Sequence, residues 1–218
     1  MRQLATLKGV RLAPSFSFGG ITPVRSQAPS MELISVQAVK HSKLLLYLSE
    51  RGLQPSDTSP FLSEVYYKVS GKCFFALGFP NDAGGWELRN PYFKGCFAPK
   101  AITTIKGTDS HKLQLFEGFM DFLSWRKLHP EGQADSIMLN SLTLLPKLIP
   151  SLCPYATIES FLDMDEAGDR ATKQLFDAGL PVKDMRACYT PYKDVNEYLV
   201  QRLQGKKISP PRKRGLRR

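Results

Sequence analysis

Residues 112–168 read KLQLFEGFMDFLSWRKLHPEGQADSIMLNSLTLLPKLIPSLCPYATIESFLDMDEAG, and this stretch decides the fold. Short apolar runs typical of strands alternate in it with longer runs typical of helices. The predicted strands are 113–116, 136–139 and 156–162, and the predicted helices between them are 119–128 and 141–149. The alternation continues with a helix at 168–178, a strand at 185–189 and a helix at 195–203. Four strands alternating with four helices predict a four-stranded parallel sheet with right-handed crossovers and flanking helices, an α/β domain over 112–204.

Acidic residues follow two of these strands directly. Glu117 comes after the first strand, and Asp163 and Asp165 come after the third. Ligands of such sheets gather at the carboxyl ends of the strands, and two aspartates two positions apart can face the same side. Crowded carboxylates repel each other unless a hard cation lies between them, and Mg²⁺ prefers a few carboxylates with water and substrate phosphates. We therefore predict a Mg²⁺ or Mn²⁺ site at these acids, with Gly118 and Gly168 allowing tight turns after them.

The preceding residues, 31–111, have a different pattern. An extended entry and an amphipathic helix are expected within 31–51, followed by β-branched and aromatic runs at 63–69 and 72–78. Ser70 and Gly71 supply the turn of a hairpin between these runs, and a third strand is expected within 81–90. Shorter extended pieces are expected near 92–94 and 102–105. This region is predicted to form a smaller α+β lobe.

The net charge of +10 is concentrated in the ends of the chain. Residues 1–30 contain four Lys or Arg and residues 205–218 contain seven, with no acid in either segment, so the rest of the chain is close to neutral. Within that rest, 31–112 is mildly basic and 113–204 is acidic, which fits a lobe that meets phosphate beside a carboxylate metal site. We expect 1–30 to be a disordered leader, with a transit peptide or a start at Met31 as alternatives, and 205–218 to be a disordered basic tail.

The four cysteines are far apart in the sequence, and the chain has only three histidines. No C-x-x-C pair is present, so we expect neither structural zinc nor a disulfide framework, and a reducing cytoplasm is the expected compartment. No apolar run approaches the ~18 residues of a membrane span, so no membrane partner is expected.

The segments Glu117-Gly-Phe-Met-Asp121 and Asp163-Met-Asp-Glu-Ala-Gly168 together resemble the TOPRIM domain. Bacterial-type primases, type IA and type II topoisomerases and some nucleases share this Rossmann-like domain. The resemblance implies that Asp163 and Asp165 bind Mg²⁺ and that Glu117 binds metal or transfers a proton. Asp121, one helical turn after Glu117, is expected to support it or the fold.

The segment Lys193-Asp-Val-Asn-Glu-Tyr-Leu199 is similar to the Lys-Asp-x-Asp-Glu-Tyr-Leu segment of primases. This similarity implies that Asp194 is a further metal ligand and that Lys193 contacts the nucleotide. Asn196 replaces the second aspartate of the segment, so the number of metal ions stays open.

The upstream lobe also resembles primases, especially those of mobile elements in Bacteroides-like bacteria. The similarity lies in Gly78-Phe-Pro-Asn-Asp-Ala-Gly-Gly-Trp-Glu-Leu-Arg-Asn90 and in Phe93-Lys-Gly95. It implies that Arg89, Lys94 and Lys100 bind nucleotide or nucleic acid. The amino-terminal zinc-binding module and the helicase-contacting module of such primases have no counterpart here, so a helicase or a separate zinc-module protein is an expected partner.

Two unrelated families also use an Asp-x-Asp pattern. An EF-hand loop is disfavoured because Gln174 stands where its bidentate glutamate belongs and a strand precedes the acids. Haloacid-dehalogenase-type phosphatases carry the pair near the start of their fold, whereas only 55 residues follow Asp163. The prediction is a primase-like nucleotidyltransferase that synthesises RNA primers on single-stranded DNA from nucleoside triphosphates with Mg²⁺. The alternatives are a TOPRIM nuclease and a catalytically impaired DNA-binding remnant on a mobile element.

Overall fold

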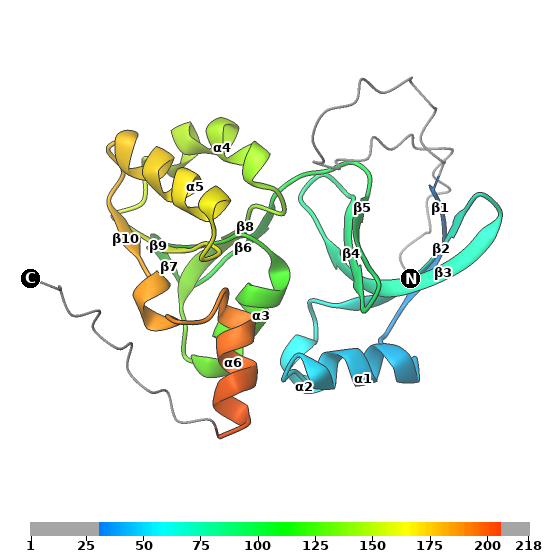
Figure 1. The fold of residues 1–218 in the computed structure, drawn as a ribbon. Helices are drawn as coiled ribbons and strands as arrows, with labels where there is room; N and C mark the ends of the chain where they lie inside the picture. Colours follow the sequence, from blue (N-terminus) through cyan, green and yellow to red (C-terminus); the bar gives the residue numbers. More distant parts are fainter. Residues whose placement is uncertain (1–30, 206–218) are drawn as a thin grey trace, which may run out of the picture. The chain divides into compact units, whose positions relative to one another are not determined.

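The computed structural model describes residues 31–205 (Figure 1). The described chain divides into two compact units, one formed by 31–47 and 58–103 and the other by 48–57 and 104–205. The predicted leader, 1–30, and all of the predicted tail except Gly205 lie outside the described residues.

The first unit contains an antiparallel sheet whose strands are adjacent in the order β1-β2-β3-β4-β5 (Figure 1). These strands are β1 (Met31–Gln37), β2 (Ser63–Val69), β3 (Lys72–Pro80), β4 (Trp86–Asn90) and β5 (Phe93–Phe97). The predicted hairpin is confirmed, because β2 and β3 pair from Ser63↔Gly78 to Val69↔Lys72. Ser70 and Gly71 have φ values of 50° and 78°, the left-handed pair that matches the twist of a two-residue hairpin.

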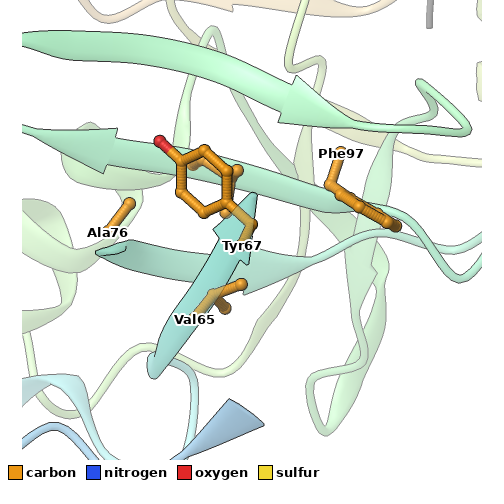
Figure 2. Close-up of a cluster of buried hydrophobic side chains, with 5 residues drawn as sticks. Val65, Tyr67, Ala76 and Phe97 are labelled. Atoms are coloured by element: carbon orange, nitrogen blue, oxygen red, sulfur yellow. The ribbon is translucent and has the colours of Figure 1, made fainter. Parts of the chain in front are cut away.

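The core of the first unit lies on one face of this sheet. Val65, Tyr67, Ala76 and Phe97, which Figure 2 labels, form a buried cluster with Leu88. They come from alternate positions on four neighbouring strands, so a single face supplies the apolar contacts.

Glu64 is buried on the opposite face of β2, with only 1% of its surface exposed. Its carboxylate accepts hydrogen bonds from the backbone N–H groups of Lys40 (2.9 Å) and His41 (2.7 Å) and from Nε2 of Gln37 (3.1 Å). Burial would raise the pKa of Glu64, but these bonds and one from Tyr66 outweigh it and hold the pKa at about 2. The carboxylate thus ties the residues before helix α1 (Ser42–Glu50) to the sheet.

We expect Glu64→Gln to lower the free energy of unfolding at pH 7 by about 1–3 kcal/mol, because two backbone N–H groups lose a charged acceptor. The pKa of Glu64 in the folded state lies below its ordinary value of 4.5, so its contribution is complete above pH 4.5 and is lost as pH falls toward 2. Urea unfolding between pH 2.5 and 7 measures this as a shrinking difference between wild type and variant. The exposed Glu50, changed to Gln, is the control. A difference that stays constant over this pH range would contradict the assignment.

The second unit is built on a sheet with the strand order β10-β9-β7-β8-β6. Its strands are β6 (Thr103–Ile105), β7 (Asp109–Phe116), β8 (Ala134–Met138), β9 (Thr157–Phe161) and β10 (Val182–Asp184). Adjacent strands from β10 to β8 are all parallel, which confirms the predicted four-stranded parallel sheet, and β6 extends it beside β8. Its helices are α3 (Phe119–Leu128), α4 (Leu145–Leu152), α5 (Glu166–Asp177) and α6 (Val195–Leu203). Helices α4 and α5 cover one face of the sheet and α3 and α6 the other (Figure 1).

The strand predicted at 185–189 is wrong. The fourth parallel strand, β10, ends at Asp184, and the 3-10 turn η2 (Arg186–Cys188) follows it. Asp184 starts the turn, because its Oδ1 accepts the backbone N–H of Arg186 at 3.0 Å. Met185 and Tyr189 are both buried, whereas Ala187 between them is exposed. A strand would place all three on one face, so this pattern fits a helical turn instead. The helix predicted at 141–149 likewise begins as the 3-10 turn η1 (Leu142–Leu144) before α4.

The boundary between the units differs from the predicted division at 111/112, because 48–57 and 104–111 belong to the second unit. Leu48 and Leu53 are buried, and a Cβ at Gly52 would lie 2.9 Å from Cδ1 of Leu203 in α6. Helix α2 (Pro55–Thr58) carries Asp57, whose Oδ2 pairs with Nζ of Lys127 at 2.7 Å. The segment 48–57 therefore packs as part of the α/β unit.

All four cysteines are free, in agreement with the absence of a disulfide framework. Among residues 31–205, no helix has the length and apolar character needed to cross a bilayer.

Candidate functional site

Strands β7 and β9 lie side by side and end together, because Phe116 is paired in register with Phe161. Their rings stack with centroids 4.8 Å apart, which fixes the two strand ends. Glu117 is the first residue after β7, and Asp163 is the second after β9. The parallel register therefore carries both acids past the same edge of the sheet, as the sequence predicts.

Asp165 begins helix α5 as its N-cap. Its Oδ1 accepts the backbone N–H groups of Ala167 and Gly168, each at 3.0 Å. A Cβ on Gly168 would lie 2.0 Å from the carbonyl oxygen of Asp163, so only glycine lets the first turn of α5 lie against the acidic loop. This close approach, rather than a tight turn, is the reason for glycine at 168. The tight turn expected at Gly118 is not seen either, since its backbone is extended (φ −146°) and open to any residue.

A second loop brings Lys193 to the two aspartates. Its Nζ lies 3.1 Å from Oδ2 of Asp163 and 3.7 Å from Oδ2 of Asp165. The backbones of the two loops are joined as well, since the N–H of Met164 donates to the carbonyl of Lys193 at 2.7 Å. The structure thus brings together three of the predicted site residues, a lysine and two aspartates.

Asp194 follows as the N-cap of α6, and its Oδ1 accepts the N–H of Glu197 at 2.7 Å. Glu197 in turn accepts the N–H of Lys193 through Oε2 at 2.7 Å. These reciprocal bonds satisfy free backbone donors at the helix start. Asp194 therefore fixes the backbone that presents Lys193.

The charges around Asp163 are crowded. Burial raises the pKa of Asp163, as do the negative charges of Asp194 and Asp165, and the hydrogen bond and charge of Lys193 only partly oppose this. Hydrogen bonding to Asp163 also raises the pKa of Lys193. A cation near Asp163 would therefore relieve an unfavourable concentration of negative charge.

Asp163 and Asp165 are the residues that fit a Mg²⁺ ion, with side chains 16% and 41% exposed. Within the described chain, no three Asp, Glu, His or Cys side chains form a group that could hold a metal. The predicted four-carboxylate set of Glu117, Asp163, Asp165 and Asp194 is thus not assembled as one cluster. Mg²⁺ commonly needs only one or two protein carboxylates, with water and phosphate oxygens completing its shell, so the aspartate pair remains a fitting donor set.

Asn196, only 1% exposed, is a core residue that joins three parts of the second unit. Its backbone N–H donates to Oδ1 of Asp121 in α3 at 3.2 Å. Its side-chain Nδ2 donates to Oγ of Ser124 and to the carbonyl of Arg51, both at 2.9 Å, and its Oδ1 accepts from Nη1 of Arg51 at 3.1 Å. The amide is fully used inside the core, so the change from aspartate to asparagine at this position serves packing. Arg51 and Ser124 were missed from the sequence.

We expect Asn196→Asp to lower the free energy of unfolding by about 2–4 kcal/mol, because a second carboxylate would lie beside Asp121 and both amide donors would be lost. Urea unfolding at pH 7 measures this loss. Gln201→Glu is the matched control, an amide-to-acid change in the same helix at a less buried position. A loss below about 0.5 kcal/mol, which is ordinary for a surface change, would show that the network contributes little.

Tyr189 is a further residue missed from the sequence. Its hydroxyl donates to the carbonyl oxygen of Leu162 at 2.6 Å, directly before the acidic loop. Burial, together with the nearby charge of Asp121, raises the pKa of Tyr189, so its proton is retained at any ordinary pH. Tyr189 thereby helps to hold the strand end from which Asp163 projects.

The predicted basic residues of the first unit are of two kinds. Arg89 on β4 is paired in register with Lys94 on β5, so two cations occupy one cross-strand site. Like charges placed opposite each other repel, which makes this pair suited to an anion such as phosphate. Lys100 forms an ion pair within the first unit, with its Nζ 2.5 Å from Oε2 of the buried Glu87.

Two protein-family models match the sequence of this chain. Residues 114–199 match a family model described as Toprim-like, and residues 33–98 match a domain of unknown function, DUF8464. No curated protein matches the chain.

Two solved structures are similar to this fold. One is the primase fragment of the bacteriophage T7 primase-helicase protein, at 19% identity and a TM-score of 0.52, covering 74% of this chain and 69% of that chain. The other is the bacteriophage T7 lagging-strand DNA polymerase interacting with primase domains bound to an RNA/DNA hybrid and dTTP. That match has 20% identity and a TM-score of 0.50, covering 72% of this chain and 84% of that chain. The predicted Toprim-like domain and the predicted fold class are confirmed, and the fold is similar to that of a primase fragment. The resemblance to primases of mobile elements in Bacteroides-like bacteria stays a prediction.

Proposed function

We propose that this chain, in which a Toprim-like domain follows an antiparallel lobe, is a primase-like nucleotidyltransferase that synthesises RNA primers on single-stranded DNA. The observation that carries the proposal is the extent of the likeness to the T7 primase fragment, 74% of the chain. That share is larger than the second unit, residues 48–57 and 104–205, so the structural likeness includes residues of the first unit as well. The acidic pair at the strand edge supports the same activity.

In the proposed reaction, a 3′-hydroxyl attacks the α-phosphate of a nucleoside triphosphate, a new P–O bond forms and pyrophosphate leaves. Asp163 and Asp165 would hold Mg²⁺, which supplies neutralisation of the charge that develops on the phosphate. Glu117, at the adjacent strand end, would accept the proton of the attacking hydroxyl. Phosphates would be bound by Lys193 and, in the first unit, by Arg89 and Lys94.

A nuclease is the second candidate, because the same aspartate pair would serve when water replaces the hydroxyl as the attacking group. The pair and its contacts lie wholly within the second unit, so nothing in the acidic site itself requires a primer terminus. A helicase or a zinc-module protein as partner, and a cytoplasmic location, belong to the primase proposal.

The test uses the full chain with single-stranded DNA, labelled ribonucleotides and Mg²⁺, and resolves the products on a denaturing gel. Template-dependent oligomers are the expected result, and they must disappear when the template is omitted or the metal is chelated. Shortened template without new oligomers would replace the primase by the nuclease. DNA binding with neither product would leave the impaired remnant.

A further inference from the structure

The ammonium group of Lys193 lies where a cation is needed. It contacts one carboxylate oxygen of Asp163 at 3.1 Å and one of Asp165 at 3.7 Å, and these are the two residues that fit the metal. Both contacted atoms are Oδ2, whereas Oδ1 of Asp165 is used in capping α5. The lysine therefore contacts the aspartate oxygen that remains available to a metal ion.

The two ends of Lys193 differ in freedom. Its backbone is fixed on both sides, since its carbonyl accepts the N–H of Met164 and its own N–H donates to Glu197, each at 2.7 Å. Its side chain is 57% exposed, and a flexible four-carbon stem carries the ammonium group. The ammonium can therefore leave the aspartates by rotation about side-chain bonds while the loop stays in place.

The size of the charge on the cation decides whether the ammonium of Lys193 or a divalent ion stays bound to the two aspartates. One ammonium leaves a net negative charge on the two carboxylates, to which Asp194 adds. A divalent ion held by the same oxygens would neutralise the pair fully and would repel the ammonium. Phosphate bound to that metal would then be the nearest anion that lacks a counter-ion.

From these contacts we propose that Lys193 is the resident counter-ion of the aspartate pair, that a divalent cation displaces it, and that the released ammonium binds a phosphate of the incoming nucleotide. This inference rests on the proposed function and adds the order in which metal and nucleotide bind. In the metal-free protein the ammonium of Lys193 is held by the aspartates, so triphosphate binds well only after the metal has entered. Metal and nucleotide binding are then coupled through one side chain, and each strengthens the other.

The test compares wild type with Lys193→Met, which keeps the length of the stem and removes its charge. Binding of Mn²⁺ without nucleotide or DNA is measured by the paramagnetic resonance signal of the free ion. We expect the variant to bind Mn²⁺ about 5- to 20-fold more tightly, because no internal cation competes. With saturating Mn²⁺, we expect its affinity for 3′-deoxyadenosine triphosphate to fall about 10-fold. Lys173→Met is the matched control, because Lys173 pairs with Asp177 on the exposed side of α5 and both affinities should stay within twofold.

The inference is overturned if wild type binds Mn²⁺ and Lys193→Met binds it no more tightly. It also fails if the variant binds the triphosphate as well as wild type does. These outcomes are independent of primer synthesis, so a chain that shows the exchange but makes no oligomers would remove the proposed function alone. A wild type that binds no Mn²⁺ would remove both.

Discussion

Replacing Asp163 by asparagine is expected to slow template-directed synthesis by about 1,000-fold, equivalent to about 4 kcal/mol of transition-state stabilisation. Asp163 is the more buried of the two aspartates and does not cap a helix, whereas Oδ1 of Asp165 caps α5. The substitution keeps the shape of the side chain and removes the charge on which metal binding depends.

The same variant is expected to unfold at an equal or higher urea concentration than wild type at pH 7. The pKa of Asp163 is raised in the folded state, so its ionised form opposes folding, and a neutral amide removes that cost. Single-turnover synthesis and urea unfolding together separate a catalytic loss from a structural one. Asp177→Asn, which changes an exposed acid at the far end of α5, is the control and should retain activity within twofold. A rate loss below tenfold for Asp163→Asn would remove it from the metal site.

Most elements were predictable because each carries its own boundary signals. The ends of α3 and α6 agree with the prediction, and α6 begins directly after its N-cap, Asp194. Strands β7, β8 and β9 each end in buried apolar residues, where helices cover both faces of the sheet. Local chemistry was sufficient in these cases.

The difference between the predicted and observed unit boundary arises from contacts between residues far apart in the sequence. The segment 48–57 joins the second unit through Arg51, whose partner Asn196 is 145 positions away in the sequence. Nothing near Arg51 in the sequence indicates that partner. The strand predicted at 185–189 is wrong for a local reason. The carboxylate of Asp184 accepts the N–H of Arg186 at the start of a 3-10 turn, and a count of apolar residues does not register this bond.

The position of the acids at the strand edge was predictable from the sequence, but the contacts between the side chains of the site were not. Parallel strands carry Glu117 and Asp163 to one edge whatever their neighbours are. The contact of Lys193 with both aspartates depends on how the loop before α6 is held by Met164, which no spacing in the sequence reveals. From the sequence, Asn196 was expected near the metal site. Its actual place in the core, with its side chain bonded to Ser124, depends on the folded structure and has no signal in the sequence.

Replacing Gly168 by alanine is the other substitution from which we expect a large effect, a loss of stability. In most helix interiors a change from glycine to alanine stabilises the helix by up to about 1 kcal/mol. Here the sign is reversed, because the added Cβ would lie 2.0 Å from the carbonyl oxygen of Asp163 and 3.0 Å from its carbonyl carbon. Both are backbone atoms that cannot rotate away, so the first turn of α5 has to move off the acidic loop.

We therefore expect Gly168→Ala to lower the free energy of unfolding by at least about 3 kcal/mol, as for other overpacked core positions. The displaced turn also loses the 3.0 Å bond from the N–H of residue 168 to Asp165, so Mn²⁺ affinity should fall in the fraction that remains folded. Urea unfolding and Mn²⁺ titration measure the two effects. Gly132→Ala is the control, because its nearest neighbour is a carbonyl oxygen at 3.3 Å, a contact that a small shift relieves. If Gly168→Ala unfolds like wild type, α5 is not pressed against the acidic loop, and the geometry that presents Asp163 and Asp165 together has to be abandoned.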